Sequence, residues 1–236
     1  MKNVELPFVK EMFDAIAPKY DLLNRLLSLR LDVCWRRVLV SEMKIPKYGQ
    51  VMDVACGTGD VPLEMIRQKG WNISVFGVDF SPGMLTLAKS KIKNMIGGHR
   101  IHLLRADAFN LPFKEETFDA ITIAFGIRNI IDKDTVLRTF HNLLKTGGIL
   151  LVLELSVPNK GLLLSIYLFY FEKILPLIGW FLSKNLKAYQ YLPSSVSKFP
   201  EADEFAAMMR SAGFTSVRWR KLTAGIATLY IGSKML

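Results

Sequence analysis

The stretch VMDVACGTGD, residues 51–60, joins a short apolar run to two glycines and two aspartates. Its first residues are suited to a buried strand, and Gly57 and Gly59 are suited to a tight turn whose backbone can approach a ligand. One carboxylate, Asp53, lies inside the run, and a second, Asp60, follows the turn. The stretch therefore predicts a strand that ends at a ligand-binding turn.

Beyond this turn, short β-branched runs alternate with segments of helical periodicity. This alternation is typical of βαβ units, in which helices cover both faces of a parallel sheet. The last two strands are separated by only two residues and should pair antiparallel. The predicted fold is α/β, a doubly wound, mostly parallel seven-stranded sheet with a C-terminal antiparallel pair. The expected strands are 51–55, 73–79, 101–107, 118–125, 149–155, 214–222 and 225–233, and the expected helices lie near 61–69, 83–95, 134–144 and 201–212.

Two segments flank or interrupt this pattern. Residues 1–45 show helical spacing and form an expected helical cover, and residues 46–236 form the main domain, with an apolar helical insertion at about 157–200. Within the insertion, residues 161–183 are long enough to span a bilayer. The charge pair Glu172–Lys173 in the middle, followed by Pro176, argues against a span. We expect an apolar cover on the site or a peripheral membrane contact, with helix-on-sheet packing as the alternative.

The charge and the cysteine and histidine content limit the class of partner, the cellular compartment and the chance of a metal site. The 31 Lys and Arg residues exceed the 21 Asp and Glu residues, for a net charge of +10. This excess favours an anionic partner, although the basic residues are scattered and suit an ordinary solvated surface as well. Two cysteines and a start without an apolar leader indicate the cytoplasm. The three histidines lack the grouping of a metal site, so no metal is expected.

The glycine turn does not fit a dinucleotide. Pro62 occupies the third glycine position of that fingerprint, and Asp60 puts negative charge where a pyrophosphate would lie. A ligand with a cationic end and a ribose diol fits better, and S-adenosylmethionine is such a ligand. Asp79 ends the second strand, 20 residues beyond Gly59, where a carboxylate can accept both ribose hydroxyls.

Residues at the end of the third strand are expected to bind the adenine of the cofactor. Asp107 and Ala108 end this strand and are placed to meet the adenine edge, while Phe80 or Phe109 could pack on the adenine face. Capping of the following helices is the competing explanation for the acidic strand ends. The predicted cofactor site comprises Asp53, Gly57, Thr58, Gly59, Asp79, Phe80, Asp107, Ala108 and Ala124.

Several motifs resemble one family of class I methyltransferases, the ubiquinone/menaquinone biosynthesis C-methyltransferases, and the resemblance covers nearly the whole chain. Two departures occur: Asp32 stands where the first family signature has histidine, and Thr146 where the second usually has proline. The similar motifs are Tyr20-Asp21-Leu22-Leu23-Asn24 with Ser28 and Trp35, Lys145-Thr146-Gly147-Gly148 with Leu153-Glu154-Leu155-Ser156, Leu111-Pro112-Phe113, Phe118-Asp119, Phe125-Gly126-Ile127-Arg128-Asn129, Tyr189-Gln190-Tyr191-Leu192 and Leu222-Thr223-Ala224-Gly225.

The resemblance implies methyl transfer from S-adenosylmethionine to a ring carbon of a demethylated polyprenyl quinol. Arg128 would stabilise developing quinolate charge, Asn129 would hold an oxygen, and Tyr20 or a water would relay the proton. An ordinary ion pair is the alternative for Arg128, and core packing is the alternative for Tyr20. The polyprenyl tail would use residues 161–183, and the protein would be cytoplasmic and peripheral to the inner face of the membrane, with a homodimer as an open expectation.

Two other functions stay open on the sequence. The positive charge suggests a methyltransferase that acts on RNA or protein, although basic residues interleaved with exposed aromatics along a groove are not evident. A methyltransferase of another small molecule stays open beside it. A non-catalytic module that only binds S-adenosylmethionine is the third possibility. We expect no nucleic-acid partner.

Overall fold

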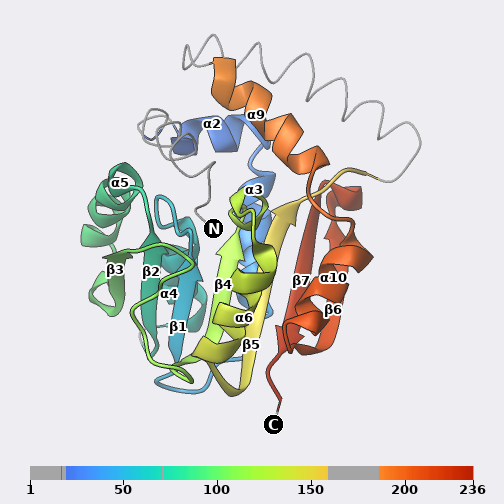
Figure 1. The fold of residues 1–236 in the computed structure, drawn as a ribbon. Coiled ribbons are helices and arrows are strands. Elements are labelled where there is room, and N and C mark those ends of the chain that lie inside the picture. The colour runs from blue at the N-terminus through green and yellow to red at the C-terminus, as the bar shows by residue number, and fades with distance from the viewer. Residues whose placement is uncertain (1–16, 18–19, 71, 159–185, 236) are drawn as a thin grey trace.

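Seven strands form one sheet in the computed structural model, which describes residues 17, 20–70, 72–158 and 186–235. The strand order is β3-β2-β1-β4-β5-β7-β6, with β1 to β5 parallel and β7 antiparallel to both of its neighbours. This order confirms the predicted fold class (Figure 1). The strands are β1 Gln50–Val54, β2 Ser74–Asp79, β3 Ile101–Arg105, β4 Phe118–Ala124, β5 Leu144–Leu155, β6 Thr215–Leu222 and β7 Ala227–Ser233.

Helices cover both faces of the sheet because the central strands are apolar on both sides. One apolar cluster joins Met52 and Ile121 to Phe140 of α6 and Phe205 of α10. The other joins Val51 to Leu39 of α3, Met65 of α4 and Ala88 of α5. The helices are α2 Tyr20–Leu27, α3 Leu31–Ser41, α4 Asp60–Lys69, α5 Pro82–Lys93, α6 Lys133–Leu143, α9 Leu186–Ser197 and α10 Ala202–Ser211.

The edge of the sheet at the carboxyl ends of the parallel strands carries the loops that matter for function. Helices α2 and α9 lie across this edge (Figure 1). A short 3₁₀ turn, Ile127–Asn129, follows β4 at the same edge and contacts α9. Ligands of open α/β sheets bind outside these strand ends, so α2 and α9 are in position to cover a ligand site.

The predicted boundaries agree with the structure to within a few residues, apart from β5 and the last connection. β5 begins at Leu144, directly after α6, because Leu144 already pairs with Phe118 of β4, and a register shift precedes the regular pairing that starts at Ile149. The connection between β6 and β7 was predicted as two residues, but four residues separate the strands. A 3₁₀ turn, Thr223–Gly225, lengthens the connection. The antiparallel pairing itself is confirmed.

The predicted cover and insertion are described in part. α2 and α3 lie within residues 1–45, and α9 lies within the predicted insertion at about 157–200. The apolar stretch 161–183 lies outside the described residues. In the part of the chain that the structure describes, no helix has both the length and the apolar character needed to cross a bilayer. The domain division itself stays a prediction.

Candidate active site

One pocket opens at the carboxyl ends of β1, β2, β3 and β4, beneath α2. Its wall combines apolar side chains with the carboxylates of Asp79 and Asp107. Apolar walls with a few polar groups are typical of small-molecule sites. The predicted site residues that line this pocket are Tyr20, Gly57, Asp79, Phe80, Asp107, Ala108, Ala124 and Asn129.

The turn after β1 is held by the carboxylate at the end of β2. Gly57 N donates to Asp79 Oδ2 (2.8 Å), and Ser81 N donates to Asp79 Oδ1 (2.8 Å). Gly57 has φ +54°, and an added Cβ there would meet no atom within 4 Å, so the turn faces open space. Asp79 thus ties two strand-end turns together while its carboxylate lines the pocket. This cradle and carboxylate suit a ligand with hydroxyl groups and a positive end.

The end of β3 forms a second wall. Phe109 N donates to Asp107 Oδ1 (3.0 Å), and Asp107 also forms an isolated bridge with Asn110. Ala108, Phe109 and Phe80 bring apolar surface to the same pocket. A carboxylate beside aromatic and small side chains can bind a flat heterocycle that carries an N–H donor.

The turn after β4 forms the opposite wall. Phe125 has φ +60°, and a Cβ on Gly126 would lie 2.7 Å from Ala55 Cβ, so only glycine fits between these two turns. Asn129 lines the pocket, and its Oδ1 accepts the hydroxyl of Tyr191 in α9 (3.1 Å). Helix α9 is thereby joined to the wall of the site.

Tyr20 closes the pocket from α2. Burial raises the pKa of its phenol above the ordinary value, and Arg36 offsets part of that rise. The phenol therefore carries its proton at neutral pH and can donate a hydrogen bond.

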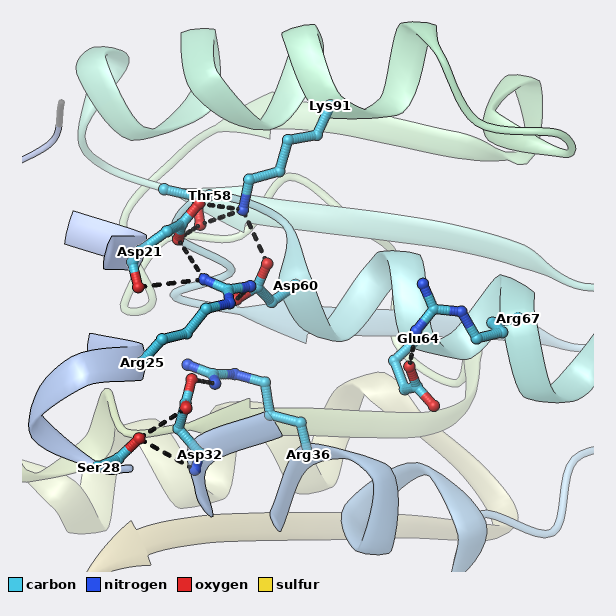
Figure 2. A network of polar contacts seen from close by, with 10 residues as sticks. All are labelled: Asp21, Arg25, Ser28, Asp32, Arg36, Thr58, Asp60, Glu64, Arg67 and Lys91. Atoms are coloured by element: carbon cyan, nitrogen blue, oxygen red, sulfur yellow. Dashed lines mark hydrogen bonds and ion pairs between the residues drawn. The ribbon is translucent and has the colours of Figure 1, made fainter. Parts of the chain in front are cut away.

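A polar network fastens α2 to the cofactor turn (Figure 2). Thr58 donates its hydroxyl to Asp21 Oδ1 (2.6 Å), and Lys91 Nζ bonds both Thr58 Oγ1 (2.9 Å) and Asp60 Oδ1 (2.7 Å). Arg25 Nη2 reaches Asp60 Oδ2 at 3.1 Å. Burial alone would raise the pKa of Asp60, but the surrounding cations Arg36, Lys91 and Arg25 hold it below its usual value. The network places Tyr20, next to Asp21, over the pocket.

Four predicted site residues do not line the pocket. Thr58 belongs to the network just described. Gly59 allows α4 and α5 to pack closely, since a Cβ added at this position would lie 3.2 Å from Ala88 Cβ. Asp53 is buried in the sheet, where its Oδ1 accepts the Thr122 hydroxyl (2.5 Å). Arg128 Nη1 donates to Glu154 Oε1 (2.7 Å), which is the ion pair named above as its alternative. A direct cofactor or substrate contact by these four stays a prediction.

Asp32, at the family's histidine position, also has a structural partner. It is buried, accepts the Ser28 hydroxyl (2.7 Å) and pairs with Arg36 Nη1 (2.5 Å). Arg36 in turn lies over the ring of Phe125, 5.2 Å from its centroid. Asp32 is thus linked to the pocket wall through Arg36 and Phe125.

Sequence reasoning missed four residues that shape the site: Asp21, Lys91, Glu154 and Tyr191. Three of them lie in motifs quoted above, yet their partners are far away along the chain. Lys91 lies in no quoted motif, and nothing in the sequence distinguishes it from the neighbouring lysines of α5. No local pattern marks such pairs.

Comparison with known proteins identifies the family of the chain. The ubiE/COQ5 methyltransferase family model matches residues 1–234. A "Ubiquinone/menaquinone biosynthesis C-methyltransferase UbiE" of Geobacter sp. (strain M21) is 47% identical over 226 residues, which are 96% of each chain. A "Demethylmenaquinone methyltransferase" of Thermus thermophilus is 44% identical over 225 residues, 94% of this chain and 100% of the relative.

Solved structures show the same fold at low identity. The [4+2]-cyclase SpnF has a TM-score of 0.72 at 16% identity, covering 97% of this chain and 95% of that one. An S-adenosyl-L-methionine-dependent methyltransferase from Methanococcus maripaludis, itself a tentative assignment, has a TM-score of 0.69 at 20% identity, covering 95% and 94%. A cyclase among these neighbours means that the fold alone does not set the reaction. The sequence match identifies the family and its reaction class. This chain belongs to the ubiE/COQ5 methyltransferase family, whose members are S-adenosylmethionine-dependent methyltransferases.

Proposed function

We propose that this protein methylates a ring carbon of a demethylated polyprenyl quinol, converting demethylmenaquinol to menaquinol. The observation that carries the proposal is the pocket in which Gly57 of the turn after β1 and Asp79 at the end of β2 meet Tyr20 and Asn129. The names of the relatives, which refer to ubiquinone and menaquinone biosynthesis and to demethylmenaquinone, support the substrate class.

The first half of the pocket would hold the cofactor. When bound, S-adenosylmethionine supplies an electrophilic methyl group carried on a sulfonium. Asp79 accepts ribose hydroxyls, and Asp107, Ala108 and Phe80 bind the adenine. Asp53, Thr58 and Gly59 contribute through the fold of the turn, and Ala124 forms the wall toward the acceptor.

The second half would hold the quinol. Asn129 Oδ1 already accepts the Tyr191 hydroxyl, so the amide N–H groups of Asn129 are directed to a quinol oxygen. The ring becomes nucleophilic when a hydroxyl proton leaves. Tyr20 keeps its own proton and serves as a hydrogen-bond donor or as one link of a relay with a water.

Arg128 lies behind the wall of the pocket and would act on the acceptor half through the turn that it holds, whereas its direct contact with a quinol oxygen stays a prediction. Its Nε is buried and has no hydrogen-bond partner among the described residues. Glu154 pairs with the guanidinium of Arg128, so the main effect of Arg128 would be to hold the neighbouring Asn129 in place rather than to balance a full quinolate charge.

Labelled S-adenosylmethionine and a short-chain demethylmenaquinol test the proposal, with mass analysis of the product. A demethylated ubiquinol precursor, a pool of RNA and other small phenols are offered in parallel. Methyl incorporation into the quinol ring supports the proposal. Incorporation only into RNA or another small molecule favours the alternative methyltransferase, and cofactor binding without turnover on any acceptor favours the non-catalytic module.

A peripheral position at the inner face of the membrane is also proposed, for a cytoplasmic protein. The support is the apolar sequence 161–183, outside the described residues, together with a substrate class that carries a polyprenyl tail. Flotation with anionic vesicles checks it, since a protein that stays at the bottom of the gradient has no such contact. A homodimer remains a prediction that sedimentation can decide.

A further inference from the structure

Glu154, near the end of β5, is a buried carboxylate that the proposed chemistry does not use. Its side chain is 0% exposed. Oε1 accepts hydrogen bonds from Arg128 Nη1 (2.7 Å) and Leu155 N (2.8 Å), and Oε2 accepts one from Arg128 N (3.1 Å). A buried charge is tolerated only when it is paired and hydrogen-bonded. Both oxygens of Glu154 are engaged, and two of the three bonds come from Arg128.

These bonds restrain the turn after β4 from outside the pocket. Arg128 Nη1 also donates to the carbonyl of Phe125 (2.6 Å), so the guanidinium links Glu154 to the first residue of the turn. Phe125 N donates to Leu153 O (2.7 Å), and Asn129 N donates to Gly126 O (3.1 Å). The end of β5 thus holds the turn at Phe125, through Leu153, and at Arg128, through Glu154, while the bond of Asn129 lies within the turn.

The same turn needs such restraint because its pocket side is strained. Phe125 is in the left-handed region at φ +60°, which costs a side chain other than glycine some conformational energy. Gly126 lies against Ala55 with no space for a Cβ. Strained backbone persists only where surrounding contacts over-determine it. Glu154 and Arg128 supply those contacts.

We propose that Glu154 is a positioning residue for the acceptor half of the site, acting through Arg128 to place Phe125 and Asn129. Glu154 does not line the pocket, whereas Phe125, Gly126 and Asn129 do. Small displacements of positioning groups lower the rate strongly, since near-attack geometry is sensitive to about 1 Å. The proposal rests on the proposed methyl transfer to a quinol.

The first test compares Glu154→Gln with Asp119→Asn. Asp119 is a matched control because it lies at the opposite edge of the sheet and has similar partners. Its Oδ2 likewise accepts hydrogen bonds from a backbone amide, Gln50 N (2.8 Å), and from a cationic side chain, Lys145 Nζ (2.8 Å). We expect Glu154→Gln to lower kcat with the quinol at least about tenfold and to leave the dissociation constant of S-adenosylmethionine within about twofold. Asp119→Asn should leave both within about twofold.

A second readout needs no substrate. Hydrogen–deuterium exchange of the peptide that contains residues 125–130 should quicken in Glu154→Gln and stay unchanged in Asp119→Asn. Where Glu154→Gln does not fold, Glu154→Asp replaces it, because it keeps the charge that faces Arg128 and withdraws the oxygens by one methylene. The same changes in kcat and exchange are expected of it.

Unchanged exchange and unchanged kcat, with only a lower melting temperature, would overturn the proposal, since Glu154 would then be merely structural. Equal losses of kcat and cofactor affinity would overturn it as well, because the effect would not be confined to the acceptor half. A wild-type protein that methylates no quinol would instead contradict the proposed function, and the exchange experiment would still decide whether Glu154 holds the turn.

Discussion

Thr58 donates its hydroxyl to Asp21 across 2.6 Å, which joins the turn after β1 to helix α2. The two residues are 37 positions apart. Lys91 bonds to both of them, so three elements of the fold meet at one point behind the glycine turn (Figure 2). The position of α2, and of Tyr20 over the pocket, depends on this junction.

Thr58→Val should therefore weaken cofactor binding although Thr58 does not line the pocket. The valine keeps the volume but leaves Asp21 and Lys91 without the hydroxyl, at a cost of about 1 kcal/mol for a neutral hydrogen bond and more for a charged partner. We expect about a fivefold to thirtyfold higher dissociation constant for S-adenosylmethionine by calorimetry. Thr139→Val is the control, since its exposed hydroxyl bonds only within α6. Equal affinities in both variants would contradict this role of the junction.

Asp79→Asn should weaken cofactor binding more strongly. The carboxylate holds the amides of Gly57 and Ser81 and faces the pocket, so the substitution removes charge-assisted bonds inside and beside the site. The expected loss is about 1.5–3 kcal/mol of binding free energy. Calorimetry measures it, and Asp119→Asn controls for the general effect of losing a carboxylate that accepts a backbone amide. Unchanged affinity would remove Asp79 from the cofactor site.

The fold and one half of the site were predictable because they depend on local pattern. Alternating strands and helices predict a doubly wound parallel sheet, and acids at strand ends such as Asp79 and Asp107 gather at one edge of such a sheet. Both line the pocket in the structure. The length of the last turn was not predictable, because the tight backbone of Thr223–Gly225 has no strong local signature.

The partners of the predicted residues were not predictable, because they come from distant parts of the chain. Arg128 looks like a substrate-binding cation until β5 brings Glu154 to it, 26 positions away. Asp53 looks like a ligand-facing acid, yet strand alternation turns it toward Thr122 in the sheet. The surroundings of Asp32 likewise come from packing, because it pairs with Arg36, and Arg36 lies over the ring of Phe125. Sequence spacing places a residue at an edge, whereas packing decides which atoms its side chain meets.

Asn129→Asp tests the acceptor half directly. The change keeps the size of the side chain but replaces the amide donor with an acceptor, which would repel the quinol oxygen. We expect turnover with demethylmenaquinol to fall at least about tenfold, an energy of about 1.4 kcal/mol or more, while the affinity for S-adenosylmethionine stays nearly constant. Steady-state kinetics and calorimetry together separate the two effects. Losses of equal size in turnover and affinity would place Asn129 in the cofactor half.

Tyr191→Phe probes the same amide from α9. It removes the hydroxyl that donates to Asn129 Oδ1 and leaves the ring in place. The orientation of the amide is then no longer fixed, so turnover should fall about threefold to tenfold, as expected for one neutral hydrogen bond. The melting temperature should change little, because the bond is only partly buried. Wild-type turnover in this variant would show that α9 does not orient Asn129.

The buried carboxyl of Asp53 gives the stability a particular dependence on pH. Burial raises its pKa to about 7, and the Thr122 hydroxyl and Arg36 offset only part of the rise. In the unfolded chain the group titrates near its usual pKa of about 4. Between about pH 4 and pH 7 the unfolded state has released this proton while the folded state keeps it, so this group lowers the free energy of unfolding as the pH rises.

Asp53→Asn removes that dependence, since the amide does not titrate and still accepts the Thr122 hydroxyl. The stability of the variant relative to the wild type should rise from pH 5 to pH 7 and level off above about pH 7. Each pKa unit is worth about 1.4 kcal/mol, so the change over this range is about 2–3 kcal/mol, measured by urea unfolding at each pH. Asp60→Asn is the control: cations hold the pKa of Asp60 below its usual value, so its contribution is complete above about pH 5 and is lost only at lower pH. A flat difference between Asp53→Asn and wild type over pH 5–8 would mean that Asp53 is already ionised in the folded protein at pH 5.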